Sequence, residues 1–201
     1  LEQFTSEGYS EAEFVDESYK EFLADQSNVI WVKHHVKTKG GFIDQFVTDF
    51  EKKYVSLYGG ASTFFPAACF DRMKFLGMED PGPAYFVESN VAFEAMLGNV
   101  NMIPSFAELN VRPKHNEADN TITVKVNLNT QANVMPGQTD LRLTTWLVED
   151  GIVSTEQKGV SGEYIQDGVI RAVLSEDVWG DKVDISSYSA SKEYSIAVDP
   201  K

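Results

Sequence analysis

The spacing of apolar residues changes near the middle of this 201-residue chain, and that change constrains the fold more than any other feature. Before about residue 101, helical spacing and short apolar runs follow each other in turn. After it, apolar and polar residues alternate, which is typical of antiparallel strands that bury one face. We therefore predict an α/β domain over residues 1–101 and a β domain over residues 102–201.

The first half carries signals for helices and strands in alternation. Ser10 and Glu13 form a capping-box sequence before a helical pattern, and Gly59-Gly60 ends the next one. The predicted helices span 10–25, 42–58 and 85–97, and the extended segments between them span 29–36 and 62–73. This order predicts a layered α/β fold with at least one parallel pair of strands.

The second half carries only strand signals. Ile122, Val124, Val126 and Leu128 alternate with polar residues, and Asp150-Gly151 is a good hairpin turn. Further strands are predicted over 107–111, 141–148, 152–157, 169–174 and 194–198. Five or six short strands at this spacing favour an antiparallel β-sandwich of immunoglobulin size.

Composition excludes several classes of function. The formal charge of −14 opposes binding to nucleic acid or to anionic lipid. Cys69 is the single cysteine, so the chain has no internal disulfide, dithiol centre or cysteine-based zinc site. No apolar run approaches the ~20 residues that span a bilayer.

Motifs for catalysis and metal binding are also missing. The sequence holds no serine-hydrolase elbow, phosphate-binding glycine loop, zinc-protease helix or dinucleotide fingerprint. His34 and His35 point to opposite faces of one predicted strand, so they cannot share a ligand set by themselves. The acidic stretches 117–120 and 176–184 invite calcium but lack the spacing of a calcium loop. We predict no cofactor, no metal site and no catalytic residue.

Two sets of residues carry a resemblance to known proteins. Leu1 to Glu7 before a capped helix, and Phe65-Pro66 leading to Asp71-Arg72, resemble a thioredoxin-fold domain. With 144–153, Gln157, 169–171 and Trp179-Gly180, they are similar to the outer-membrane-protein-28-related family of Bacteroidetes surface lipoproteins. The resemblance implies a degenerate thioredoxin-like domain, then an immunoglobulin-like β-sandwich. It also implies export to the outer membrane or cell surface, with a lipid anchor upstream of this chain.

The chain departs from the family where many members carry Cys-x-x-Cys. Tyr9, Ser10, Glu11 and Ala12 stand at those positions, so no thiolate is present to attack a disulfide. Pro66 matches the proline beside that site. We consider a surviving peptide-binding groove lined by Tyr9, Phe65 and Pro66, and the alternative that the proline only holds a strand bend.

The resulting prediction is a non-catalytic, redox-inactive binding protein of the cell envelope, whose partner is a protein, a peptide or a glycan. One alternative is an adhesin or glycan-contact module in which Trp179 is exposed; another is a monothiol enzyme that uses Cys69. In its apolar segment Cys69 is expected to be a small buried side chain. The chain starts at Leu1 without a methionine, and the family pattern continues past Lys201, so we expect sequence upstream and an incomplete second domain.

Overall fold

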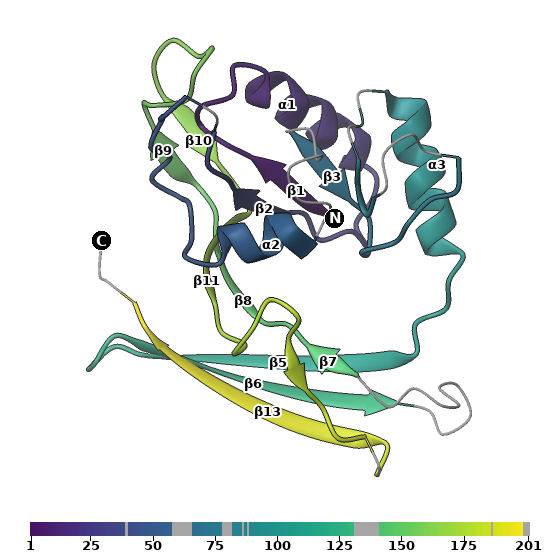
Figure 1. The fold of residues 1–201 in the computed structure, drawn as a ribbon. Helices are drawn as coiled ribbons and strands as arrows, with labels where there is room; N and C mark the ends of the chain where they lie inside the picture. The colour runs from purple at the N-terminus through teal and green to yellow at the C-terminus, as the bar shows by residue number, and fades with distance from the viewer. Residues whose placement is uncertain are drawn as a thin grey trace. The chain divides into compact units, whose positions relative to one another are not determined.

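The computed structural model divides the chain into two compact units (Figure 1). Unit 1 comprises Leu1–Ile103 and Leu147–Ala172, and unit 2 comprises Pro104–Trp146 and Val173–Lys201. The structure describes residues 1–38, 40–57, 66–77, 82–85, 87, 89–130, 141–185 and 187–198. Within these residues, no helix has both the length and the apolar character needed to cross a membrane.

Unit 1 is built on a six-stranded mixed sheet with the order β4-β3-β1-β2-β11-β8. Its strands are β1 (Glu2–Thr5), β2 (Val32–His35), β3 (Ala67–Cys69), β4 (Ala84–Tyr85), β8 (Trp146–Glu149) and β11 (Val169–Val173). β2 runs parallel to both β1 and β11, whereas β3 is antiparallel to β1 and β4 is antiparallel to β3. A separate hairpin joins β9 (Ile152–Ser154) to β10 (Tyr164–Gln166). The predicted parallel pair is therefore present.

The described residues of unit 1 contain three helices, and all three differ from the predicted ranges. The first, α1 (Ala12–Leu23), starts later than predicted, because its N-cap is Glu11 and not Ser10. The Glu11 side chain makes no capping hydrogen bond. The second, α2 (Glu51–Leu57), lacks the predicted residues 42–50. In that stretch the Asp44 carboxylate accepts a hydrogen bond from Phe46 N. Local bonds of this kind, from a side chain to nearby backbone, compete with the hydrogen bonds of a helix. The third, α3 (Asn90–Asn101), begins five residues later than predicted and ends four residues later, because Ser89 is its N-cap and the Ser89 hydroxyl accepts from Ala92 N.

The main core of unit 1 lies where α1 and α3 meet the sheet. Tyr19 from α1 and Phe93 from α3 are almost fully buried, with ring centroids 5.2 Å apart. Phe70 and Tyr85 supply aromatic surface from the strand side. Because rings of this size dominate the energetics of apolar burial, this cluster fixes α1 against the sheet and so places the loop that precedes it.

The described residues of unit 2 form two antiparallel sheets. A three-stranded sheet has the order β13-β6-β5, from β5 (Ala107–Asn116), β6 (Thr121–Thr130) and β13 (Ser189–Ala197). A short pair joins β7 (Arg142–Leu143) to β12 (Asp181–Lys182). One core cluster of unit 2 is formed by apolar side chains from both sheets and from the segment after β12, namely Val124, Val126, Leu143, Val183 and Tyr194.

The predicted boundary near residue 102 lies close to the observed end of the first segment, but the chain later returns to unit 1. Segments 152–157 and 169–174, predicted as strands of the β-sandwich, lie mainly in residues 147–172. β11 joins the sheet beside β2, where Lys33 N donates to Gly168 O over 2.6 Å. Local alternation shows that a strand has a buried face but not which sheet it joins, so the sequence pattern could not reveal this return.

Candidate functional site

The candidate site is the loop at residues 6–11, here called the β1 loop, which joins β1 to α1. Ser6 and Glu7 are fully buried, whereas Ser10 and Glu11 are exposed at the start of the helix. The predicted site residue Tyr9 lies between them and is partly exposed. Burial raises the pKa of the Tyr9 phenol to about 12, and the nearby carboxylates of Glu51 and Asp44 add to the rise. Tyr9 is therefore a neutral side chain at physiological pH.

A second segment covers this loop from the far end of the sequence. We call residues 154–159 the strap. Gln157 Nε2 donates to the carbonyl oxygen of Tyr9 over 2.9 Å, and Lys158 N donates to that of Glu7 over 2.8 Å. The Ser154 hydroxyl also donates to the buried Glu7 carboxylate. Two loop carbonyls that could pair with an extended ligand are thus already hydrogen-bonded within unit 1.

The contact between strap and loop is close enough to require a glycine. Gly159 has a φ of +87°, and a Cβ built there would lie 2.7 Å from the carbonyl oxygen of Ser10. That distance is too short for a real Cβ contact, and the left-handed φ already disfavours other residues. Loop and strap are therefore fitted backbone to backbone.

Under the loop lies a buried carboxylate with four donors. Asp44 accepts from His35 Nδ1, the Ser6 hydroxyl, Glu7 N and Phe46 N over 2.8–2.9 Å. Burial alone would raise the pKa of this carboxyl, but the hydrogen bond and charge of His35, with the backbone donors, hold it below its ordinary value. The arrangement keeps an ionised aspartate inside unit 1.

This cluster does not form a nucleophile relay. The Ser6 hydroxyl donates to Asp44 and accepts from Gly8 N, while His35 bonds to the same carboxylate oxygen. A serine nucleophile needs its proton directed to the imidazole, and here it is directed to the acid. The geometry anchors the loop to β2, where His35 lies.

A second buried network joins α1, β1, β2 and β10. Asp16 forms a buried ion pair with Lys33 and accepts from Gln3 Nε2 over 2.8 Å and from the Tyr164 hydroxyl over 2.7 Å. Burial raises the pKa of Tyr164, and the adjacent Asp16 charge raises it further. Gln3 of β1 and Lys33 of β2 therefore meet at Asp16 of α1, and Tyr164 joins them there from 148 residues further along the chain.

The two adjacent histidines of β2 have separate partners, as their predicted opposite orientation requires. His34 Nε2 lies 3.0 Å from Glu2, which also receives Arg72 Nε over 2.9 Å, whereas His35 faces Asp44. Burial would raise the pKa of Glu2, but His34 and Arg72 lower it to about 2. Among the described residues, no three His, Cys, Asp or Glu side chains are grouped closely enough to hold a metal ion.

The other predicted site residues lie apart from the β1 loop or outside the described residues. Pro66 is buried directly before β3, whereas Phe65 is not among the described residues, so the groove stays a prediction. Trp179 belongs to unit 2 and is 56% exposed, which the glycan-contact alternative requires. Cys69 is fully buried, and burial raises its thiol pKa to about 12, with Glu2 adding to the rise.

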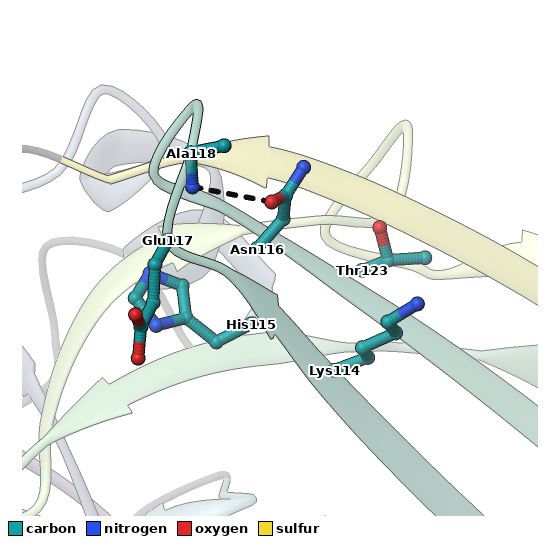
Figure 2. Close-up of a pocket in the computed structure, with 6 residues that line it drawn as sticks. All are labelled: Lys114, His115, Asn116, Glu117, Ala118 and Thr123. Atoms are coloured by element: carbon teal, nitrogen blue, oxygen red, sulfur yellow. Dashed lines mark hydrogen bonds between the residues drawn. The ribbon is translucent and has the colours of Figure 1, made fainter.

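The turn between β5 and β6 holds an open depression in unit 2 (Figure 2). It is lined by Lys114, His115, Asn116, Glu117, Ala118 and Thr123. Asn116 Oδ1 accepts from Ala118 N, and His115 Nε2 lies 2.9 Å from Asn120 Oδ1. These bonds close a solvent-exposed turn at the acidic stretch 117–120.

Sequence reasoning missed the strap and both buried networks. Buried ionisable residues are rare, and the pattern around Lys33 and Asp16 resembles an ordinary amphipathic surface. The one available signal was Gln157, which the family resemblance includes without indicating its contact with the β1 loop.

Comparisons with known proteins were made for sequence and for fold. The family model of outer membrane protein Omp28 matches residues 84–200. The chain is similar in fold to HBP35 of Porphyromonas gingivalis, with a TM-score of 0.77 and 17% identity. That match covers 98% of this chain and 63% of the HBP35 chain, so the present chain spans less than two thirds of it. No curated protein matches the sequence.

Proposed function

Because the chain belongs to the outer membrane protein Omp28 family and is a cell-envelope protein, we propose that it acts there by binding, without catalysis. Unit 1 is a thioredoxin-like domain without redox activity in this proposal. Support comes from its topology, in which β1 and β2 are parallel and β3 and β4 follow antiparallel, with α1 directly after β1. The immunoglobulin-like arrangement of unit 2 remains a prediction.

The observation that carries the proposal is the state of the β1 loop. Tyr9 and Ala12 stand where a dithiol would react, and the strap occupies the carbonyls of Glu7 and Tyr9. Thiol–disulfide exchange needs an accessible thiolate, whereas Cys69 is fully buried with a raised pKa. These facts weigh against the monothiol alternative and favour a scaffold that presents a surface.

We take the exposed end of α1 as that surface. Ser10 and Glu11 are exposed, and Phe14 one turn later exposes 66% of its surface. Exposed aromatic side chains beside charges are common anchors in protein interfaces. Glu13 and Glu17 on the same exposed side make it acidic, so a protein or peptide segment with basic residues is the partner that it fits.

Photo-crosslinking in the native envelope tests this proposal. A photoreactive amino acid at Ser10 should capture a defined partner, and Phe14→Ala in the same chain should reduce that capture. A photoreactive group at Glu94, exposed on α3, serves as the control position. Equal capture at both positions, or capture unaffected by Phe14→Ala, would contradict a binding surface at the end of α1.

The exposure of Trp179 supports a second candidate, a glycan-contact surface on unit 2. Exposed indole rings stack on sugar faces, and Tyr188 in the same unit is 52% exposed. A glycan array should then show ligands that are lost with Trp179→Ala and kept with Phe14→Ala. An array without ligands would remove this candidate and leave the first one standing.

The lipid anchor is also a proposal, based on the family resemblance alone. In cells, the full natural protein should remain in the outer-membrane fraction after a high-salt or alkaline wash. Release of the protein by that wash would indicate peripheral attachment instead.

A further inference from the structure

One edge of the unit 2 sheet exposes an apolar strip. Among the strands that the structure describes, β5 is the edge strand beside β6, and its Leu109 and Val111 are 52% and 56% exposed. Their cross-strand neighbours on β6, Leu128 and Val126, are buried. Since paired residues in an antiparallel ladder share a face, the apolar face of the sheet extends onto β5 without the covering that it has over β6.

The backbone of β5 is oriented for further pairing. Thr130 N donates to Tyr188 O, so even-numbered residues of β6 point their backbone groups toward β13. Odd-numbered residues of β6 then point toward β5, where they pair with even-numbered residues. The N–H and C=O groups of Leu109 and Val111 consequently point to the open edge. The backbone of Pro113 also points to the open edge. Because it faces away from β6, its missing N–H removes no hydrogen bond from the ladder between β5 and β6.

The opposite edge is less suited to pairing through an apolar strip. On β13 the large apolar side chain Tyr194 is buried in the unit 2 core, and serine or charged residues occupy the alternate positions. β5 also carries charged residues at its alternate positions, among them Glu108 and Arg112, so the two edges differ in the exposed apolar strip and not in polarity. β5 is therefore the edge whose apolar surface is available.

The sequence of β5 is complementary to itself. If two copies of β5 run antiparallel around a two-fold axis at Asn110, Glu108 of one lies opposite Arg112 of the other. In the same register Leu109 lies opposite Val111 of the second copy, and their outward backbone groups face each other. Opposite charges on one face and apolar pairs on the other are the pairs that stabilise such ladders.

We propose that β5 is a homodimerisation edge, and that two copies of this chain pair there antiparallel about Asn110. The occupant is a second copy because the chain's own β5 supplies both the charge pairing and the apolar pairing in one register. The paired sheets form six continuous strands, and Leu109 and Val111 are covered by their counterparts.

A register-specific disulfide tests the proposal. Asn110 faces its own counterpart at a non-hydrogen-bonded position, where Cα atoms lie about 4.5 Å apart, within the range of a disulfide. Asn110→Cys should give a covalent dimer under mild oxidation. Glu108→Cys is the matched control on the same face, because its counterpart is about 14 Å away along the strand. Cys69 is buried and can stay in both variants.

The dissociation constant of the dimer, measured on the full chain, gives an independent test. Sedimentation equilibrium should show a reversible dimer of the 22.4 kDa protein. Glu108→Arg should weaken dimerisation at least about tenfold, because two like-charge pairs replace two opposite ones, and Glu108→Arg/Arg112→Glu should restore it. Circular dichroism confirms that each variant is folded.

Three results would overturn the proposal. One is a monomer up to about 300 µM, a concentration at which even a small interface should associate. Another is equal crosslinking of Asn110→Cys and Glu108→Cys. The third is a dimer that neither charge variant changes; a dimer of that kind would use another surface.

Discussion

Gly159 shows at the scale of one residue how closely the strap and the β1 loop fit. Gly159→Ala places a Cβ against the carbonyl oxygen of Ser10 and should lower the free energy of unfolding by roughly 2–3 kcal/mol. Gly162→Ala is the matched control, because Gly162 also has a positive φ but open space around it. It should cost about 1 kcal/mol. Urea unfolding measures both, and equal costs would mean that the strap does not press on the loop.

Asp16 and Lys33 make a prediction about buried charge. Asp16→Asn leaves the buried Lys33 ammonium without its counter-charge and should destabilise the protein by about 3–5 kcal/mol. Adding Lys33→Met to this variant should recover part of the loss, because no unpaired charge remains. Glu17→Gln removes the exposed pair with Lys20 and should change stability by less than about 0.5 kcal/mol. Urea unfolding measures these losses. A double variant whose loss of stability equals the sum of the losses of Asp16→Asn and Lys33→Met would argue against the ion pair.

Glu2 makes the stability of the protein depend on pH. Its pKa is lowered from 4.5 to about 2 in the folded protein, so its contribution is complete above pH 4.5 and is lost as the pH falls toward 2. The contribution is roughly 3 kcal/mol. Glu2→Gln should therefore reduce stability at pH 6 and flatten the decline between pH 4.5 and 2. Glu94→Gln, an exposed control, should leave the decline unchanged in thermal unfolding.

At the scale of elements, β11 links the later part of the chain to the first sheet. Ile170→Ala empties a buried position in this strand and should cost about 2–4 kcal/mol. Ile165→Ala in β10 removes the same atoms from a position that is 44% exposed and should cost about 1 kcal/mol or less. Similar losses in denaturant unfolding would contradict the burial of β11 in unit 1.

The sequence predicted the elements better than their partners. The positions of α1 and β2, though not their bounds, follow from spacing and β-branched residues, because those signals are local. The predicted helix over 42–58 was too long, since Asp44 forms tertiary bonds to His35 and Ser6 that no local pattern contains. Strand β11 was found, but its place beside β2 depends on a contact across more than 130 residues.

The same distinction applies to the candidate site. The absence of a dithiol and the burial of Cys69 could be predicted from the sequence, because each depends on residue type and immediate neighbours. The strap could not be, because Gln157 and Lys158 reach the β1 loop from 148 and 151 residues away. Neither could Asp16 and Lys33, whose burial depends on their being paired.

At the scale of the whole molecule, membership of the Omp28 family and the structure of unit 1 point in one direction. The family places the chain in the cell envelope, where thiol–disulfide chemistry is common. The chain instead closes the β1 loop with its own strap and buries its one thiol. We interpret unit 1 as a scaffold that presents the exposed end of α1 and unit 2 as the place where copies associate.

Turnover of a disulfide substrate by the purified chain tests the central claim of a non-catalytic protein most directly. The rate of turnover should not exceed the rate in buffer and reductant without the protein. Cys69→Ser should leave it unchanged, because the thiol is buried and its pKa is raised to about 12. Turnover by the folded chain that Cys69→Ser abolishes would contradict the account and establish a monothiol enzyme in its place.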